Sequence, residues 1–308
     1  MIRVSFLIVC LTFGFFSSSC SQEKKLFQEK LALEKAQIEK WCTDLRGEIK
    51  TLGWTNIDPC ITKPWKVGGT SVENRPLVYA EFGNPNGKNT TLILSMVHSD
   101  EITPLYVGIR LIEWLQKHVQ QHPEARVILA PLVNPDGLYR RPRSRMNARG
   151  VDVNRNFATA DWNKKALLLW RERYKSNPRR FPGHQPHSEP ETLFQDELIK
   201  KYQPQKILSI HAPLRFMDYD GPNFLTLSRF PKDYVKKCIE LSKKVNAVSG
   251  GFYPGSLGNY AGQEKGIPTL TLELPSANPD KASQYWETFS QGITSVIQFE
   301  VPSYASKD

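Results

Sequence analysis

Strong apolar runs separated by helical segments constrain the fold of this chain more than any other feature. TLILSMV is a continuous apolar run, and RVILAPLV, KILSI and TLTLEL follow it along the chain with helical or polar segments between them. Apolar strands of this kind are buried on both faces, which is typical of parallel sheets covered by helices. The sequence therefore predicts a single three-layer α/β/α domain with a mixed, mostly parallel central sheet.

Three of these runs end on reactive side chains. TLILSMV leads into His98, with Glu101 three residues later, KILSI leads into His211, and TLTLEL contains Glu273. The carboxyl ends of strands in an open α/β sheet meet at the ligand-binding crevice. Two imidazoles and one carboxylate, with a position left for water, form the ligand set of an open zinc site. We therefore predict that His98, Glu101 and His211 bind one Zn²⁺ ion.

Glu273 is an acidic residue inside an otherwise apolar strand. A buried carboxylate without a partner is costly, so this side chain must face a metal, a base or water. The pattern favours a general base that acts on a metal-bound water. A structural ion pair is the alternative.

The first twenty residues differ from the rest of the chain. A short cationic start precedes VSFLIVCLTFGFF and then a small-residue exit that ends on Cys20, which is the pattern of a secretory signal peptide. Two outcomes remain open, namely a lipid-bearing Cys20 and plain signal cleavage nearby. Either one predicts an exported bacterial protein, periplasmic or attached to the membrane as a lipoprotein.

The charge of the chain points to an anionic target. The formal net charge is +10, and Arg3 is the sole charged residue among the first nineteen, so their removal leaves +9. In an exported protein this excess favours an anionic polymer or a membrane surface. Nucleic acid is not expected, because the sequence has no interleaved aromatic platform and no known nucleic-acid module.

The remaining chain divides at changes in composition. Residues 21–66 are predicted to form an amphipathic helix and a linker, residues 67–302 the catalytic domain, and residues 303–308 a tail. The part of the chain from 51 to 70 is rich in Gly, Pro and Lys, which favours an extended linker. Cys42 and Cys60 are either bridged or free, since their spacing decides nothing. The sequence gives no oligomeric state.

A long polar segment, NPDGLYRRPRSRMNARGVDVNRNF, follows the second strong strand and is more typical of a functional loop than of a connector. With the predicted metal ligands, it resembles the zinc carboxypeptidases of the M14 family. The matching pieces are His98-Ser-Asp-Glu101, Asn134-Pro-Asp-Gly137, Arg145 in RMNARG, Gly150-Val-Asp-Val-Asn-Arg-Asn156, His211 and Glu273 in TLTLELP. They occur in the family's order over residues 71–299.

The resemblance implies a zinc carboxypeptidase-like fold and a role for each matching residue. His98, Glu101 and His211 would bind zinc, and Glu273 would be the base. Arg145 would polarise the scissile carbonyl, with Arg143 as its competitor. Asn154 and Arg155 would hold the substrate's terminal carboxylate, for which the fork of a guanidinium is well suited.

The chain departs from the family after the second histidine, where His211 is followed by Ala-Pro-Leu instead of Ser-Tyr. The family's mobile tyrosine has two candidate counterparts, Tyr253 and Tyr260. Tyr253 is favoured by its place before the GSLG turn.

Several segments are most similar to the bacterial murein peptide amidase branch of the family, which cuts the bond from γ-D-glutamate to meso-diaminopimelate in cell-wall peptides. The substrate expected from this resemblance is a peptidoglycan peptide. Asp218 or Asp220 would then contact the far ammonium of diaminopimelate, unless the DYDG segment is only a turn.

Three other functions compete with this prediction. The protein would be a carboxypeptidase that trims wall peptides, a general metallocarboxypeptidase for protein-derived peptides, or an inactive wall-peptide-binding protein. The masses of the products separate the enzymes from one another. Metal analysis separates an enzyme from the inactive binding protein.

Overall fold

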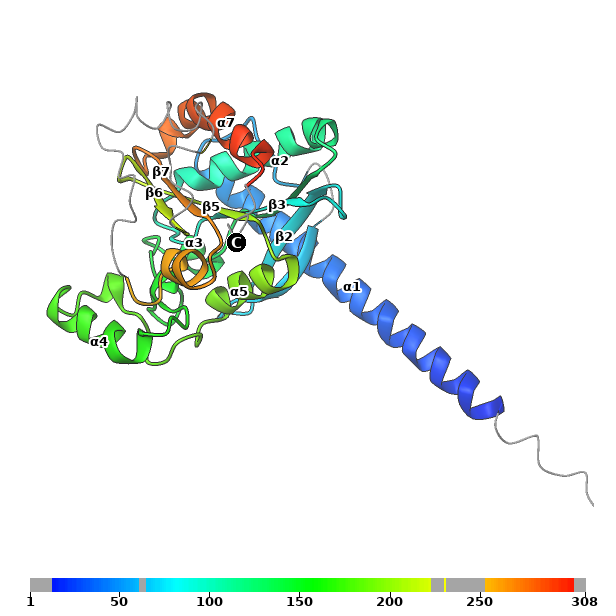
Figure 1. The fold of residues 1–308 in the computed structure, drawn as a ribbon. Coiled ribbons are helices and arrows are strands. Elements are labelled where there is room, and N and C mark those ends of the chain that lie inside the picture. Colours follow the sequence, from blue (N-terminus) through cyan, green and yellow to red (C-terminus); the bar gives the residue numbers. More distant parts are fainter. Residues whose placement is uncertain (1–12, 61–64, 223–229, 231–252, 302–308) are drawn as a thin grey trace, which may run out of the picture.

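A seven-stranded mixed sheet forms the centre of the protein in the computed structural model, with the strand order β1-β2-β4-β3-β5-β7-β6 (Figure 1). The structure describes residues 13–60, 65–222, 230 and 253–301, without the side chains of residues 13–21 and 23. The strands are β1 (Trp65–Thr70), β2 (Pro76–Gly83), β3 (Asn89–Ser95), β4 (Ala125–Ala130), β5 (Lys206–His211), β6 (Phe216–Asp220) and β7 (Thr269–Glu273).

Parallel pairing is confined to the centre of the sheet. Strand β3 runs parallel to β4 and β5, and β5 runs parallel to β7. The pairs β1 with β2, β2 with β4, and β6 with β7 are antiparallel. The mixed α/β sheet predicted from the sequence is thus confirmed, and the carboxyl ends of β3, β5 and β7 lie at one edge.

Helices cover both faces of the sheet. The α-helices are α1 (Phe13–Thr51), α2 (Thr103–His118), α3 (Pro135–Tyr139), α4 (Trp162–Glu172), α5 (Pro190–Tyr202) and α7 (Ala282–Gln298). The short helices are η1 (Val119–Gln121), η2 (Val153–Arg155), η3 (Pro178–Arg180), η5 (Gly258–Glu264) and η6 (Pro279–Lys281).

The two faces carry separate hydrophobic cores. On one face, α2, α7 and the end of α1 pack on the sheet, and α2 buries Leu105, Ile109, Ile112 and Leu115 there. On the other face, Phe194 and Leu198 of α5 pack with Phe157 and Tyr260. The expected three-layer arrangement follows from these two cores.

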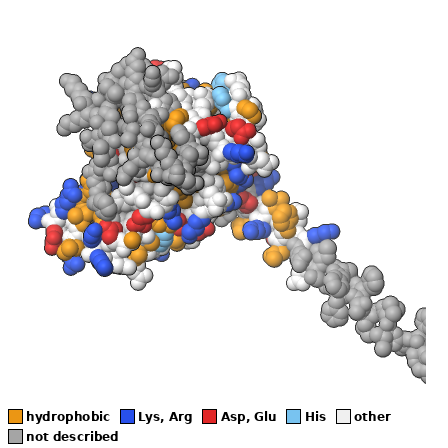
Figure 2. Space-filling view, in the orientation of Figure 1, with side chains coloured by type: hydrophobic (Ala, Val, Ile, Leu, Met, Phe, Trp, Pro, Cys, Tyr) orange, Lys and Arg blue, Asp and Glu red, His pale blue; other side chains and the backbone are white. Residues whose placement is uncertain are grey.

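Helix α1 projects away from the domain at its N-terminal end (Figure 1). Only its last turns are buried, through Trp41, Leu45 and Ile49. Hydrophobic side chains remain exposed on the part that leaves the domain (Figure 2), namely Leu26, Phe27, Leu31 and Leu33. Across the described residues, we find no helix with the length and apolar character needed to cross a membrane.

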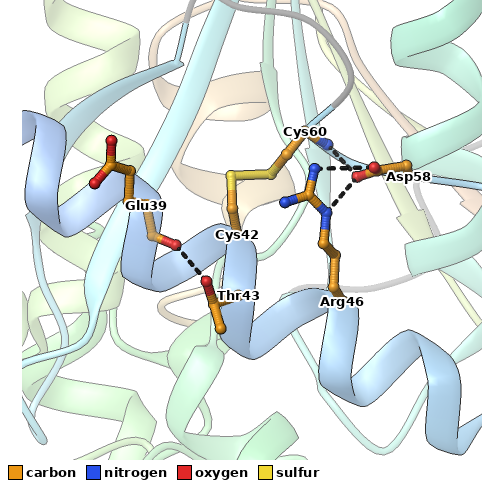
Figure 3. The surroundings of a disulfide bond; sticks show 6 residues. All are labelled: Glu39, Cys42, Thr43, Arg46, Asp58 and Cys60. Carbon is orange, nitrogen blue, oxygen red and sulfur yellow. Dashed lines mark hydrogen bonds and ion pairs between the residues drawn. A yellow bond between two sulfur atoms is a disulfide. The ribbon is translucent and has the colours of Figure 1, made fainter.

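A disulfide and an ion pair fasten α1 to the segment that follows it (Figure 3). Cys42 and Cys60 are bridged, with their Cα atoms 5.9 Å apart. One helical turn after Cys42, the Arg46 guanidinium donates Nε and Nη2 to the two carboxylate oxygens of Asp58, at 3.0 and 2.9 Å. The structure thus resolves the choice between bridged and free cysteines in favour of the bridge.

Two segments differ from their predictions. Residues 65–70 do not form a linker, because Trp65–Thr70 pairs with β2 as an edge strand and the Trp65 ring lies 4.8 Å from that of Trp41. The DYDG segment is not merely a turn, since Asp218 and Asp220 lie in β6, paired with β7.

Other predictions concern residues at the limits of the described chain. Helix α1 begins at Phe13, inside the predicted signal segment, and the processing of residues 1–20 stays a prediction. A predicted helix over residues 234–248 lies outside the described residues.

Candidate active site

The three predicted metal ligands meet at the carboxyl edge of the sheet. His98 follows β3, Glu101 precedes α2, and His211 is the last residue of β5. The Nδ1 atoms of the two histidines lie 3.1 Å apart, and each lies 3.0 Å from a carboxylate oxygen of Glu101. One ligand atom from each residue falls within 4.8 Å of the others, so the three can share one ion.

The outer nitrogens of both histidines are held by neighbouring side chains. His98 Nε2 lies 3.0 Å from Asp152 Oδ1, and His211 Nε2 lies 2.9 Å from Ser209 Oγ. An Nε2 proton donated to these oxygens leaves both Nδ1 lone pairs facing the cluster, which is the arrangement found around metal-bound histidines. The donor set therefore fits zinc.

Asp152 and Ser209 were not assigned a role from the sequence. The signal for Asp152 is its place two residues before Asn154 in the matching GVDVNRN segment. Ser209 carries a weaker signal, since it is a polar residue two positions before His211 in an otherwise apolar strand.

Both buried carboxylates of this cluster are anionic. Burial alone would raise the pKa of Glu101, but the imidazoles of His98 and His211 hold that pKa well below its usual range. Burial acts on Asp152 in the same direction, and there Arg145 and His98 hold the pKa well below its usual value. A negative charge at Glu101 suits a metal ligand, and one at Asp152 suits an acceptor for an imidazole N–H.

Glu273 lies beside the metal ligands, because β5 and β7 pair His211 with Glu273 in parallel register. Its Oε2 accepts a hydrogen bond of 3.4 Å from the Leu214 N–H. Burial raises the pKa of the Glu273 carboxyl to about 7. A carboxylate that takes up a proton near neutral pH is suited to general-base chemistry.

Arg145, and not its competitor Arg143, reaches the cluster. Arg145 Nη1 lies 3.1 Å from Glu101 Oε1, and its Nε donates to Asp152 at 3.0 Å. Arg143 instead donates to Glu48 of α1. The structure thus favours Arg145 among the two arginines.

Asn154 and Arg155 lie in η2 and line the same cavity. Asn154 Oδ1 accepts from the Leu257 N–H at 2.8 Å, which fixes the amide. Arg155 Nη1 donates to the carbonyl of Asn154 at 2.6 Å, while its buried Nε has no hydrogen-bond partner within the described part of the chain. The guanidinium therefore retains capacity for an anionic ligand.

The two tyrosine candidates lie in different surroundings. Tyr253 lines the cavity, with its ring 4.7 Å from the guanidinium carbon of Arg155. Tyr260 donates its hydroxyl to Asp196 at 2.6 Å and stacks on Phe157. Tyr253 is therefore the candidate that can contact a ligand.

A cavity of about 290 Å³ is lined by the metal-ligand cluster, Asn154, Arg155 and Tyr253, and by further charged residues. Arg179 and Arg180, which were assigned no role from the sequence, also line it, and Arg179 pairs with Asp100 at 2.5 Å. Asp220 also lines the cavity, and it accepts from Gln263 at 3.4 Å. Burial, reinforced by Asp218, raises the pKa of Asp220 to about 7.

Comparison with known proteins shows the family of this chain. Residues 56–277 match the family described as zinc carboxypeptidase, Peptidase_M14. The chain belongs to the zinc carboxypeptidase family. It is 31% identical to murein peptide amidase A of Escherichia coli K12 over 220 residues, which cover 70% of this chain and 83% of the relative. It is 28% identical to murein peptide amidase A of Vibrio campbellii, covering 69% of this chain and 79% of that one.

Solved structures of the zinc carboxypeptidase fold agree with the sheet described above. The murein-tripeptide amidase of E. coli O157 superposes with a TM-score of 0.57 at 24% identity, covering 79% of this chain and 94% of that one. Carboxypeptidase A of Helicoverpa armigera gives a TM-score of 0.59 at 20% identity, covering 86% and 72%. The protein is therefore a hydrolytic enzyme of a family that uses zinc, and His98, Glu101 and His211 can hold the ion.

Proposed function

We propose that this enzyme hydrolyses the amide bond between γ-D-glutamate and meso-diaminopimelate in peptides of the bacterial cell wall. The similarity to murein peptide amidase A supports this substrate class. The observation that carries the proposal is the charge distribution of the cavity, where arginines gather around the metal ligands and the buried Asp220 also faces the cavity.

This distribution complements diaminopimelate better than an ordinary terminal amino acid. In the tripeptide, the amide-linked end of diaminopimelate carries a free carboxylate next to the scissile bond, and the other end carries an ammonium and a second carboxylate. Arg155 and Asn154 bind the first carboxylate, and Asp220 accepts hydrogen bonds from the ammonium. Arg179 and Arg180 add positive charge for the remaining carboxylates.

The residues around the metal ligands divide the chemistry between them. A zinc ion held by His98, Glu101 and His211 would supply an activated water and polarise the carbonyl oxygen. Glu273 accepts the proton of that water and delivers it to the leaving nitrogen. Arg145 stabilises the negative charge that develops on the carbonyl oxygen. Tyr253, which lies over Arg155, covers the bound carboxylate.

Export is part of the proposal, because the substrate lies outside the cytoplasm. Residues 1–20 direct the chain to the periplasm, with Cys20 as the site of lipid attachment. Metabolic labelling with palmitate tests the attachment, and equal labelling of wild type and Cys20→Ser would exclude it.

Mass spectrometry of defined muropeptides tests the function. We expect wild type to release diaminopimelate from the tripeptide L-Ala-γ-D-Glu-meso-diaminopimelate, and a chelator to stop the reaction until zinc is restored. Glu273→Gln should retain zinc and lose hydrolysis. Release of terminal D-alanine from longer peptides, without cleavage of the γ-D-glutamyl bond, would instead identify a trimming carboxypeptidase.

A matched pair of variants tests recognition of the ammonium. Asp220→Ala should lose activity on the diaminopimelate tripeptide, while Asp280→Ala, which removes an exposed carboxylate outside the cavity lining, should not. An equal loss by Asp220→Ala on peptides with and without the far ammonium would contradict the role of Asp220.

A further inference from the structure

A buried carboxylate of α1 holds two arginines of the loop that carries Arg145. Glu48 is 5% exposed and lies near the C-terminal end of α1. Its Oε2 accepts from Arg141 Nη2 at 2.6 Å, and its Oε1 accepts from Arg143 Nε at 3.0 Å and Nη2 at 2.5 Å. One carboxylate thus binds two guanidinium groups more than 90 residues away in the sequence.

Glu48 lies outside the part of the chain that matches the family, while Arg141 and Arg143 lie inside it. The zinc carboxypeptidase match begins at residue 56, eight residues after Glu48. A carboxylate buried to this degree is costly unless it is paired, and loss of one partner leaves the other uncompensated. The pairing of Glu48 with Arg141 and Arg143 therefore fixes how α1 contacts the loop.

The loop has little freedom once this contact is made. Arg143 precedes Arg145 by two residues, and between them the Ser144 N–H donates to the Gly137 carbonyl at 3.0 Å. Asn134 Nδ2 donates to the Arg145 carbonyl at 3.3 Å. Glu48 therefore holds the loop from its outer side, and residues of the domain hold it from the inner side.

The far side of the same loop is held in a similar way. Asn147 Nδ2 donates to Glu189 at 2.7 Å and to Glu191 at 2.8 Å, and both of these carboxylates are buried. The Arg145 backbone thus lies between two acidic anchors, of which only Glu48 comes from α1.

Helix α1 is itself fixed where it presents Glu48. The bridge from Cys42 of α1 to Cys60 lies just before Glu48 (Figure 3), and Leu45 and Ile49 beside Glu48 are buried. Glu48 is therefore held at a fixed position relative to the sheet. A residue on an unattached helix would not have a fixed position.

We propose that Glu48 is a positioning residue, which holds Arg141 and Arg143 so that Arg145 stays directed at the metal site. Helix α1 is then part of the active-site architecture in addition to being a spacer. The inference rests on the proposed function, because it takes Arg145 as the group that stabilises the reacting carbonyl.

Activity measurements separate positioning from a merely structural role. Glu48→Gln removes the charge and leaves two arginines uncompensated, so kcat on the diaminopimelate tripeptide should fall at least tenfold with bound zinc unchanged. KM should change less, because Glu48 contacts Arg141 and Arg143 and does not contact Arg155, which lies in η2. Glu48→Asp should restore part of kcat. Asp58→Asn, which breaks the other carboxylate to arginine pair at α1, should leave kcat within about twofold of wild type.

A double-mutant cycle tests the contact itself. Arg143→Gln removes one of the two contacts of Glu48 from the loop side, so the double variant Glu48→Gln/Arg143→Gln should lose no more kcat than Glu48→Gln alone. Additive losses would overturn the proposal. If Glu48→Gln does not fold, Arg143→Gln compared with Asp58→Asn carries the activity test.

Hydrogen exchange separates a failure of this inference from a failure of the proposed function. In Glu48→Gln, amides of residues 140–149 should exchange faster than in wild type, while Asp58→Asn should leave them unchanged. This result does not require turnover, so it decides the inference even if wild type does not cleave the tripeptide. Unchanged exchange in Glu48→Gln, or wild-type kcat in that variant, would overturn the positioning role.

Discussion

Lys206 offers a test of the electrostatics of the sheet that does not depend on catalysis. This first residue of β5 is fully buried, and its ammonium donates to Asn89 Oδ1. Burial lowers the pKa of Lys206 from 10.5 to about 7, and the charge of Glu300 opposes only part of that shift. A charged Lys206 therefore lowers the free energy of unfolding whenever the pH is low enough to protonate it in the folded protein.

The sign and size of the pH dependence follow from these values. Between about pH 7 and 10.5 the folded state holds Lys206 neutral while the unfolded chain keeps it charged, so the free energy of unfolding rises with pH. The penalty is roughly 5 kcal/mol below pH 7 and fades by about 1.4 kcal/mol per pH unit above it. Lys206→Met removes this pH-dependent penalty.

Urea unfolding of wild type and Lys206→Met from pH 6 to pH 10 measures the effect. The stability of the variant relative to wild type should fall by about 3 to 4 kcal/mol between pH 7 and pH 10. Loss of the hydrogen bond to Asn89 adds a constant offset of roughly 1 to 3 kcal/mol, which does not change this slope. Lys88→Met, on the surface, is the control, and parallel curves for wild type and Lys206→Met would refute the reasoning.

Three further predictions concern the site and α1. Asp152→Asn removes the anion beside His98, so zinc affinity should fall roughly 10- to 100-fold in competition with a chelating dye, and unchanged affinity would contradict the proposed orientation of that imidazole. Cys42→Ser opens a bridge between residues 18 apart, and denaturant unfolding should show a loss of about 3 kcal/mol; a loss well under 1 kcal/mol would argue against tight fastening by Cys60. Because the pKa of Asp220 is about 7, KM for the ammonium-bearing tripeptide should decrease as the pH rises through 7, and a pH-independent KM would speak against that contact.

The strand pattern was sufficient to predict the metal cluster. His98, His211 and Glu273 follow or end strands that the structure pairs in parallel, and parallel strands align their carboxyl ends. This local rule needs no knowledge of the loops. The mixed sheet was predicted for the same reason, since apolar strands mark its centre.

The contacts around the cluster could not be predicted in the same way. His98 is paired with Asp152, and Arg143 is paired with Glu48. Both acidic partners come from segments far away in the sequence, and the composition of these segments does not differ from that of exposed polar regions. Strand β6 was also missed, because edge strands are short and their pattern resembles that of a turn. Such features depend on tertiary pairing, which a periodicity argument does not contain.

The length of α1 has a mechanical consequence if the chain is tethered near its beginning. From Cys20, the proposed site of lipid attachment, to the turn before Ile38, a helix of about 18 residues spans roughly 27 Å. A flexible chain with the same number of residues would have a root-mean-square end-to-end distance of roughly 23 Å and would often fold back on its tether. The rigid helix instead keeps the active site at a nearly constant distance from the attachment point. The enzyme would therefore reach the polymer substrate at that distance and not the part of it next to the attachment point.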